Sequence, residues 1–182
     1  ARSDTAIGLS NVGWGLTFLA KFDEAHSLLE ENLAILSDLG ASSSVAYWTL
    51  WLGYAKAHLG QYEQARIRAQ MSHTFFQEHG SQSGRIALSL YMLGFVALAE
   101  QAYAEAWQLL QESVAVFQRI KYWEIMGWGL SLLGYAPRGL GQLLQAERQF
   151  CEALRSSSEV GSFVHHLLVL PGIALLLADR GE

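Results

Sequence analysis

Residues that could perform chemistry are few and widely separated in this sequence. The pair His165-His166 has the residue type of a zinc site, but adjacent helical residues point about 100° apart, and no carboxylate or cysteine stands at ligand spacing nearby. The glycine-rich stretch 134–141 lacks the Gly-Lys-Ser/Thr ending of a phosphate loop. Cys151 is the only cysteine, which excludes an internal disulfide and a cysteine-based metal cage. We therefore predict no catalytic residue, no metal, no cofactor and no enzymatic activity.

Composition and charge favour a helical protein that does not bind nucleic acid. Of the 182 residues, 51% are hydrophobic and only two are proline, so the chain can bury a continuous core and is predicted to be all-α. The net charge is −5 and the twelve basic residues are scattered, so no basic patch is available for a phosphate backbone.

Three expectations concern the setting of the chain. Its longest apolar run, 167–178, is too short for a bilayer and contains Pro171, so no membrane segment is predicted. The single cysteine fits a reducing compartment, and we expect a cytoplasmic protein. Because the sequence starts at Ala1 without Met and ends where a helical hairpin would turn, we expect a fragment of a longer protein.

An internal repeat organises the whole sequence. Four segments align without gaps, at spacings of 40, 41 and 40 residues, and they are GWGLTFLAKFDEA (13–25), GYAKAHLGQYEQA (53–65), GFVALAEQAYAEA (94–106) and GYAPRGLGQLLQA (134–146). Each segment begins with a glycine and ends with an alanine, two small residues that allow a pair of helices to approach closely. Between them an apolar residue recurs at the start of the second helix: Phe22, Tyr62, Tyr103 and Leu143. The repeat therefore predicts stacked helical hairpins.

The helix ends can be placed from the same alignment. Fifteen residues after each alanine stand Gly40, Gly80, Lys121 and Gly161, and glycine ends a helix in the left-handed conformation without steric cost. We predict first helices at about 5–19, 44–59, 84–99, 123–139 and 163–178, and second helices at about 23–39, 63–79, 104–120 and 144–160. These form repeats 5–40, 44–80, 84–121 and 123–161 and a partial repeat or capping helix 163–182, within a single domain 1–182.

The strings LGYAKAHLGQYEQA and LGFVALAEQAYAEAWQLLQESVAVF resemble tetratricopeptide repeats (TPR) of the long, roughly 40-residue kind. The chain is similar in particular to the TPR sensor arrays of bacterial signal-transduction ATPases and transcription regulators of the maltose-activator class. The resemblance implies a right-handed α-α superhelix of about four hairpins plus a terminal helix, with a concave groove lined by the first helices. Two departures, Pro137 inside a first helix and Lys121 at a glycine position, predict local distortion of the fourth repeat.

The resemblance also supplies candidate binding residues. The groove-facing positions of the family correspond here to a set rich in aromatic side chains: Trp14, Phe18, Tyr47, Tyr54, His58, Tyr91, Phe95, Trp128, Tyr135 and Arg138. Such a row of rings could clamp an extended ligand. The alternative is that the rings only pack the first helices together. For Trp48, Trp51, Trp107 and Trp123, outside this row, we predict packing roles.

The second helix of repeat 2 is unusually polar. It carries Arg68, His73 and His79 where repeats 1 and 3 carry leucine, valine or isoleucine. This difference indicates either a partner-contact face or pH-sensitive joint, or simply polar groups satisfied within the fold.

The predicted function is binding. The leading hypothesis is a protein-interaction or scaffold module that holds in its groove a peptide or partner domain belonging to the same or another chain. The second is an effector-sensing regulatory domain of a bacterial signalling protein, and the third is a rigid spacer. The apolar stripe 167–177 also makes end-to-end self-association plausible.

Overall fold

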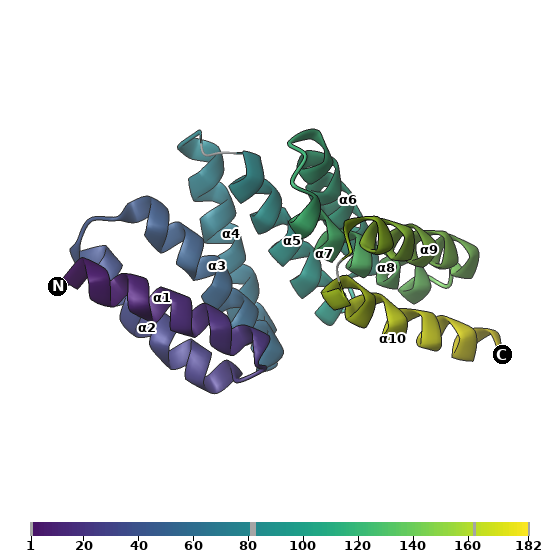
Figure 1. The fold of residues 1–182 in the computed structure, drawn as a ribbon, viewed down its shortest axis with the longest axis horizontal. Helices are drawn as coiled ribbons and strands as arrows, with labels where there is room; N and C mark the ends of the chain where they lie inside the picture. The colour runs from purple at the N-terminus through teal and green to yellow at the C-terminus, as the bar shows by residue number, and fades with distance from the viewer. Residues whose placement is uncertain (1, 81–82, 162, 182) are drawn as a thin grey trace. The chain divides into compact units, whose positions relative to one another are not determined.

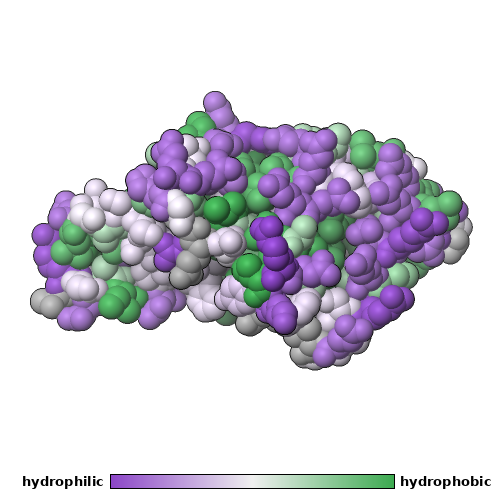
Figure 2. All heavy atoms as spheres, turned by 90° about the horizontal axis from the view of Figure 1, so that it is seen from above, coloured by the Kyte–Doolittle hydropathy of each residue, from purple (hydrophilic) through white to green (hydrophobic). Residues whose placement is uncertain are grey.

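The structure, a computed structural model, describes residues 2–80, 83–161 and 163–181, and within them it leaves out the side chains of Glu124, Val160 and residues 163–165. The described chain is helical throughout and divides into two compact units, residues 1–85 and 86–182. The prediction of an all-α chain of successive helical hairpins is therefore confirmed. On the face shown in Figure 2, hydrophilic side chains are interspersed with smaller groups of hydrophobic ones.

Unit 1 consists of two helical hairpins (Figure 1). The first joins α1 (Arg2–Phe18) to α2 (Phe22–Asp38), and the second joins α3 (Ser42–His58) to α4 (Tyr62–Glu78). Helix α3 packs against both α4 and α2, which links the hairpins. Helix α5 (Ser83–Ala99) begins in unit 1 and continues into unit 2.

Unit 2 repeats this arrangement with one interruption. After α5 come α6 (Tyr103–Arg119), α7 (Trp123–Leu133), α8 (Tyr135–Gly139), α9 (Leu143–Val160) and α10 (Phe163–Arg180). The predicted first helix 123–139 is divided at Gly134 into α7 and α8. Pro137 explains the division, because it has no N–H to donate to the carbonyl of Leu133. The expected distortion at Pro137 is thus confirmed, and all other helix bounds lie within three residues of the predicted ones.

Small residues hold the paired helices close together, as the repeat predicts. The four alanines Ala25, Ala65, Ala106 and Ala146 are fully buried. A Cβ atom added to Gly94 would lie 2.7 Å from Cγ of Leu110, and one added to Gly134 would lie 2.4 Å from the Phe150 ring. Only glycine leaves room for these side chains between the two helices.

Each turn that connects one hairpin to the next contains one left-handed residue. At the ends of the second helices these residues are Gly40, Gly80, Lys121 and Gly161, as predicted. Lys121 adopts a φ of 57°, and its turn keeps the bonds of a Schellman motif, with Lys121 N–H donating to Gln118 O (3.1 Å) and Tyr122 N–H to Phe117 O (3.0 Å). The expectation that Lys121 distorts the fourth repeat was therefore wrong, because lysine accepts the conformation at an energetic cost.

The turn inside each hairpin has a left-handed residue as well, which the sequence analysis missed. These residues are Ala20, Gly60, Gln101 and Gly141, again at spacings of 40, 41 and 40, and Gly181 follows after α10. The same pair of hydrogen bonds closes each turn, for example Lys21 N–H to Leu16 O at 3.0 Å and Ala20 N–H to Thr17 O at 3.3 Å. Both kinds of turn in the repeat thus use one geometry.

No helix in the described part of the chain combines the length and apolarity needed to cross a membrane.

Candidate binding site on the first helices

Seven rings in unit 1 form what we call the ring cluster: Trp14, Phe18, Phe22, Tyr47, Trp51, Tyr54 and His58. Trp48 adjoins this cluster, with its ring centroid 5.2 Å from that of Tyr47. Helix α1 contributes the first two, α3 contributes the last four, and Phe22 begins α2. Trp14 lies edge-on to Phe18, with ring centroids 4.7 Å apart, and 6.2 Å from Trp51. The structure therefore brings together all five unit 1 residues of the predicted groove.

Trp51 connects the two halves of the ring cluster. Its ring lies 6.4 Å from Phe18, 6.5 Å from Tyr47 and 6.0 Å from Tyr54, and it is only 3% exposed. By contrast Trp14 is 42% exposed and Phe18 51% exposed. The packing role predicted for Trp51 fits its burial, but its place beneath the exposed rings was missed. Its spacing of four residues from Tyr47 and three from Tyr54 on one helix carried that information.

His58 is fixed at one end of the ring cluster. Its imidazole stacks on Phe22 with the centroids 4.2 Å apart and the planes 1° from parallel, and Tyr54 lies edge-on at 4.5 Å. Burial against these rings lowers the pKa of His58 and raises the pKa of Tyr54. Both side chains are therefore neutral near pH 7, and this end of the cluster offers an uncharged surface.

Unit 2 carries a pocket of about 330 Å³ that contains three of the predicted residues, Phe95, Tyr135 and Arg138. Its other lining residues are Leu98, Ala99, Tyr103, Leu132, Gly139 and Leu168. Gly139 is required here, because a Cβ atom at that position would lie 2.4 Å from the Tyr103 ring. The pocket is thus an aromatic and aliphatic cavity with a single cationic side chain.

Polar contacts hold the pocket residues in place. Arg138 pairs with Asp179 through two contacts, Nε to Oδ2 at 2.6 Å and Nη2 to Oδ1 at 3.1 Å. The Tyr135 hydroxyl donates a hydrogen bond of 3.0 Å to the carbonyl of Leu168, and burial raises the pKa of Tyr135. Since both polar groups are oriented before any ligand arrives, the pocket is preorganised.

The two remaining predicted residues lie together elsewhere in unit 2. The ring centroids of Tyr91 and Trp128 are 6.2 Å apart, and Tyr91 is only 5% exposed. Neither residue lines the unit 2 pocket. They pack α5 against α7 in the way that the alternative interpretation of the aromatic row describes.

A buried lysine was missed by the sequence analysis. Lys56 is 5% exposed, and its Nζ lies 2.8 Å from Nε2 of His26 and donates a 3.2 Å hydrogen bond to Gln61. Burial, followed by the nearby Arg68 charge, lowers the pKa of Lys56, whereas Glu30 opposes that shift. The sequence offered one indication of this burial: the equivalent positions in the other three repeats hold the uncharged residues Leu16, Ala97 and Pro137.

The polar residues of repeat 2 are engaged within the fold. Arg68 lies 3.7 Å from Glu30, His73 is buried, and the His79 ring stacks on Phe75 at 4.1 Å. Among the residues that the structure describes, no three His, Cys, Asp or Glu side chains lie close enough to hold a metal ion. His166 Nε2 lies 3.2 Å from the Ser157 hydroxyl, while the side chain of His165 is outside the described part.

Comparison with solved structures identifies the fold. An aspartyl phosphate phosphatase F from Bacillus subtilis matches all of this chain with a TM-score of 0.81 at 15% identity, and a Rap protein complexed with competence and sporulation factor matches 97% with a TM-score of 0.87 at 12% identity. Kinesin light chain TPR-like repeats from Podosopora anserina match 95% with a TM-score of 0.66 at 17% identity. The fold is of the tetratricopeptide-repeat type.

These likenesses concern the TPR-type fold alone, because every identity is below 20%. The chain spans about half the length of the first two proteins (47% and 49%) and 95% of the third. No protein-family model matches the sequence, and no curated protein sequence matches it.

Proposed function

We propose that this TPR-type chain is a protein-interaction module that binds an extended peptide, or a segment of a partner protein, over the ring cluster of unit 1. One observation carries the proposal: Trp14 and Phe18 present 42% and 51% of their surface to solvent while resting on the buried Trp51. Exposed aromatic side chains on a rigid base bury a large apolar area and lose little conformational entropy on binding.

The chemistry of the surface indicates the type of peptide. The rings themselves carry no charge near pH 7, since burial keeps the His58 imidazole neutral, and Arg85 borders them with its guanidinium 5.6 Å from the Tyr47 ring centroid. A segment with apolar or aromatic side chains, free of charge at the positions that touch the rings, suits it best. Backbone amides of an extended peptide can also lie flat on aromatic faces. Binding is proposed to depend on the rings of α1 and α3. Tyr91 and Trp128, which pack together within unit 2, are not part of the proposed binding surface.

The solved structures support the proposal at the level of fold. The Rap protein is described in complex with competence and sporulation factor, so a TPR-type chain of similar architecture takes a partner. We carry over only the use of such a fold for binding.

The test is a peptide selection followed by measured affinities. Peptides are selected from a random display library on the wild-type chain, labelled with a fluorophore, and titrated by fluorescence anisotropy against a Trp14→Ala/Phe18→Ala variant. Because each ring is an exposed anchor, the double variant should bind at least about tenfold more weakly. Both side chains lie outside the core, so circular dichroism should show unchanged helix content.

The matched control is Trp123→Ala. Trp123 is 45% exposed, nearly the same as Trp14, but it begins α7 in unit 2 and lies outside the ring cluster. Loss of affinity in the Trp14/Phe18 variant with full affinity in the Trp123 variant supports the proposal. Equal affinities in all three proteins, or a library that yields no binder, would refute it.

A second candidate function rests on the unit 2 pocket. Its volume of about 330 Å³ lies at the lower end of small-molecule sites, and Arg138 would attract an anionic group that replaces Asp179. The chain would then sense a small apolar carboxylate and act as a regulatory domain. A panel of aromatic and aliphatic carboxylates should raise the melting temperature of the wild type and not of an Arg138→Gln variant; a panel without effect would dismiss this candidate.

A further inference from the structure

Helix α4 departs from the other second helices on its solvent-exposed side. Ile67 is 52% exposed and Met71 is 63% exposed, one helical turn apart. The repeat spacing aligns Ile67 with three exposed polar residues, Ser27, Gln108 and Arg148, and it aligns Met71 with three exposed glutamates, Glu31, Glu112 and Glu152. A single exposed apolar residue is ordinary, but this pair replaces polar residues at two equivalent positions in one repeat only.

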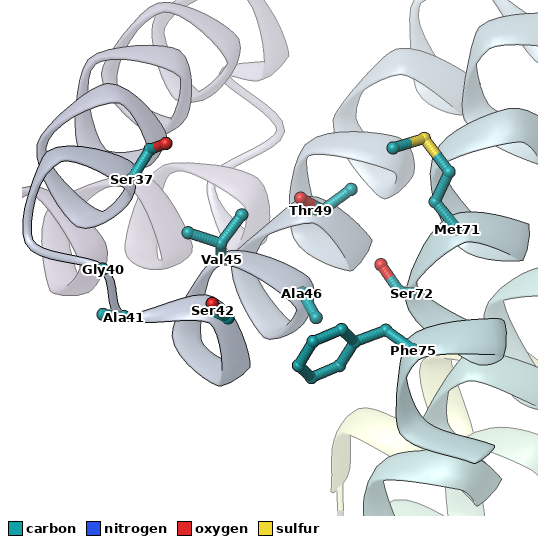
Figure 3. Close-up of a pocket in the computed structure, with 10 residues that line it drawn as sticks. All are labelled: Ser37, Gly40, Ala41, Ser42, Val45, Ala46, Thr49, Met71, Ser72 and Phe75. Carbon is teal, nitrogen blue, oxygen red and sulfur yellow. The ribbon is translucent and has the colours of Figure 1, made fainter. Parts of the chain in front are cut away.

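A pocket adjoins Ile67 and Met71, which we call the apolar ridge. It measures about 250 Å³, and Met71, Ser72 and Phe75 of α4 form one wall, across from Val45, Ala46 and Thr49 of α3 (Figure 3). Figure 3 shows the Phe75 ring directed toward Ala46. That ring is held by His79, which stacks on it at 4.1 Å. The Ser72 hydroxyl donates a 3.0 Å hydrogen bond to Arg68 O, so this wall does not need a polar ligand.

The same surface therefore carries a projecting apolar side chain and a cavity beside it. Such a surface can be complementary to itself, because in a two-fold contact each copy supplies both parts. When two α4 helices pack antiparallel and cross at Met71, each residue before Met71 faces the residue equally far after Met71 in the second copy. Ile67 then faces Phe75 of the second copy, and each Met71 lies at the axis beside the pocket of the other.

Charge selects the antiparallel arrangement. Arg66 and Glu78 border the ridge at its two ends, twelve residues or about 18 Å apart along the helix. In the antiparallel pair, Arg66 of one copy lies near Glu78 of the other, at both ends. In a parallel pair, like charges would meet at both ends, which is destabilising.

We propose that the outer face of α4, formed by Ile67, Met71 and Phe75 with the adjoining pocket, is a two-fold interface between two copies of this chain. The interface consists of α4 residues and of the pocket wall from α3, and it shares no residue with the ring cluster, so it does not rest on the proposed function. One helix pair forms a small contact, and we expect a weak dimer with a dissociation constant of about 1–100 µM.

The test is sedimentation equilibrium of the 182-residue chain from about 1 µM to about 1 mM, which brackets that range. The wild type should shift from monomer to dimer with concentration. An Ile67→Gln/Met71→Glu variant, which installs residues found at the equivalent positions, should weaken the dimer at least about tenfold. Glutamine and glutamate favour helix at these exposed positions, so the fold should be unaffected, as circular dichroism would verify.

Charge-swap variants test whether Arg66 of one copy pairs with Glu78 of the other. Arg66→Glu alone and Glu78→Arg alone should each weaken the dimer about threefold to tenfold, whereas the double swap should restore it. The matched control Leu170→Gln changes a residue of α10 that is 52% exposed and should leave the dimer intact. A monomer at every concentration overturns the proposal, as does a dimer that Leu170→Gln disrupts and Ile67→Gln/Met71→Glu does not.

Discussion

Replacing Lys121 by glycine should stabilise this chain, although glycine inside a helix ordinarily destabilises it. Lys121 has a φ of 57°, a conformation that costs a residue with a Cβ atom about 1–2 kcal/mol. Glycine avoids that cost but loses about 0.5–1 kcal/mol more backbone entropy on folding. The difference predicts that the free energy of unfolding rises by about 0.5–1 kcal/mol and the melting temperature by about 2 °C.

The assay is urea unfolding followed by far-ultraviolet circular dichroism. The two hydrogen bonds of the turn come from backbone N–H groups and remain in the variant, so no compensating loss is expected. Lys121→Ala keeps the Cβ atom and should change stability little. The reverse substitution Gly40→Ala, at the equivalent turn, should destabilise by about 1 kcal/mol. A Lys121→Gly variant that is less stable than the wild type would refute the argument from turn geometry.

Three further predictions follow from packing and charge. Gly134→Ala places a Cβ atom 2.4 Å from the Phe150 ring and should cost about 1–3 kcal/mol in the same unfolding assay. Lys56→Met should stabilise the chain by about 1 kcal/mol at pH 7. The pKa of Lys56 is lower in the folded chain than its ordinary value of 10.5, so the unfolded chain binds more protons as pH rises toward 10.5. The free energy of unfolding of the wild type should therefore rise over that range, and the variant should not show this rise. A peptide that covers His58 should bind more weakly as pH falls through the pKa of His58 in the free chain, which burial lowers from its ordinary value, because the peptide would remove still more water from the imidazolium; anisotropy titrations on His58→Phe should show no such fall.

Repeat-based reasoning predicted the fold because the signals were steric and periodic. A glycine that faces a large side chain, as Gly134 faces Phe150, has no substitute, and it therefore recurs at a fixed spacing. The inner turns were missed because their left-handed position is glycine only in some repeats and is Ala20 or Gln101 in others. Backbone geometry persisted there while residue identity did not, so a search for glycines alone could not find it.

The candidate site was predicted in part for a similar reason. Alignment to the groove-facing positions of TPR arrays found the exposed Trp14 and Phe18, but it omitted Trp51, which fixes them from below. The alignment also placed Tyr91 in the groove, where it is buried. Position within a repeat specifies the helix that a side chain belongs to. How far the side chain reaches solvent depends on the size of its neighbours, which the repeat does not conserve.

The measurement that tests the central claim most directly is fluorine NMR of the chain labelled with 5-fluorotryptophan, titrated with a peptide selected on the wild type. Each of the six tryptophans gives its own resonance, assigned by Trp→Phe variants. Binding over the ring cluster predicts that the resonances of Trp14 and Trp51 shift in a saturable manner, while that of Trp123 stays in place. Saturable binding that leaves Trp14 and Trp51 unchanged would contradict the account.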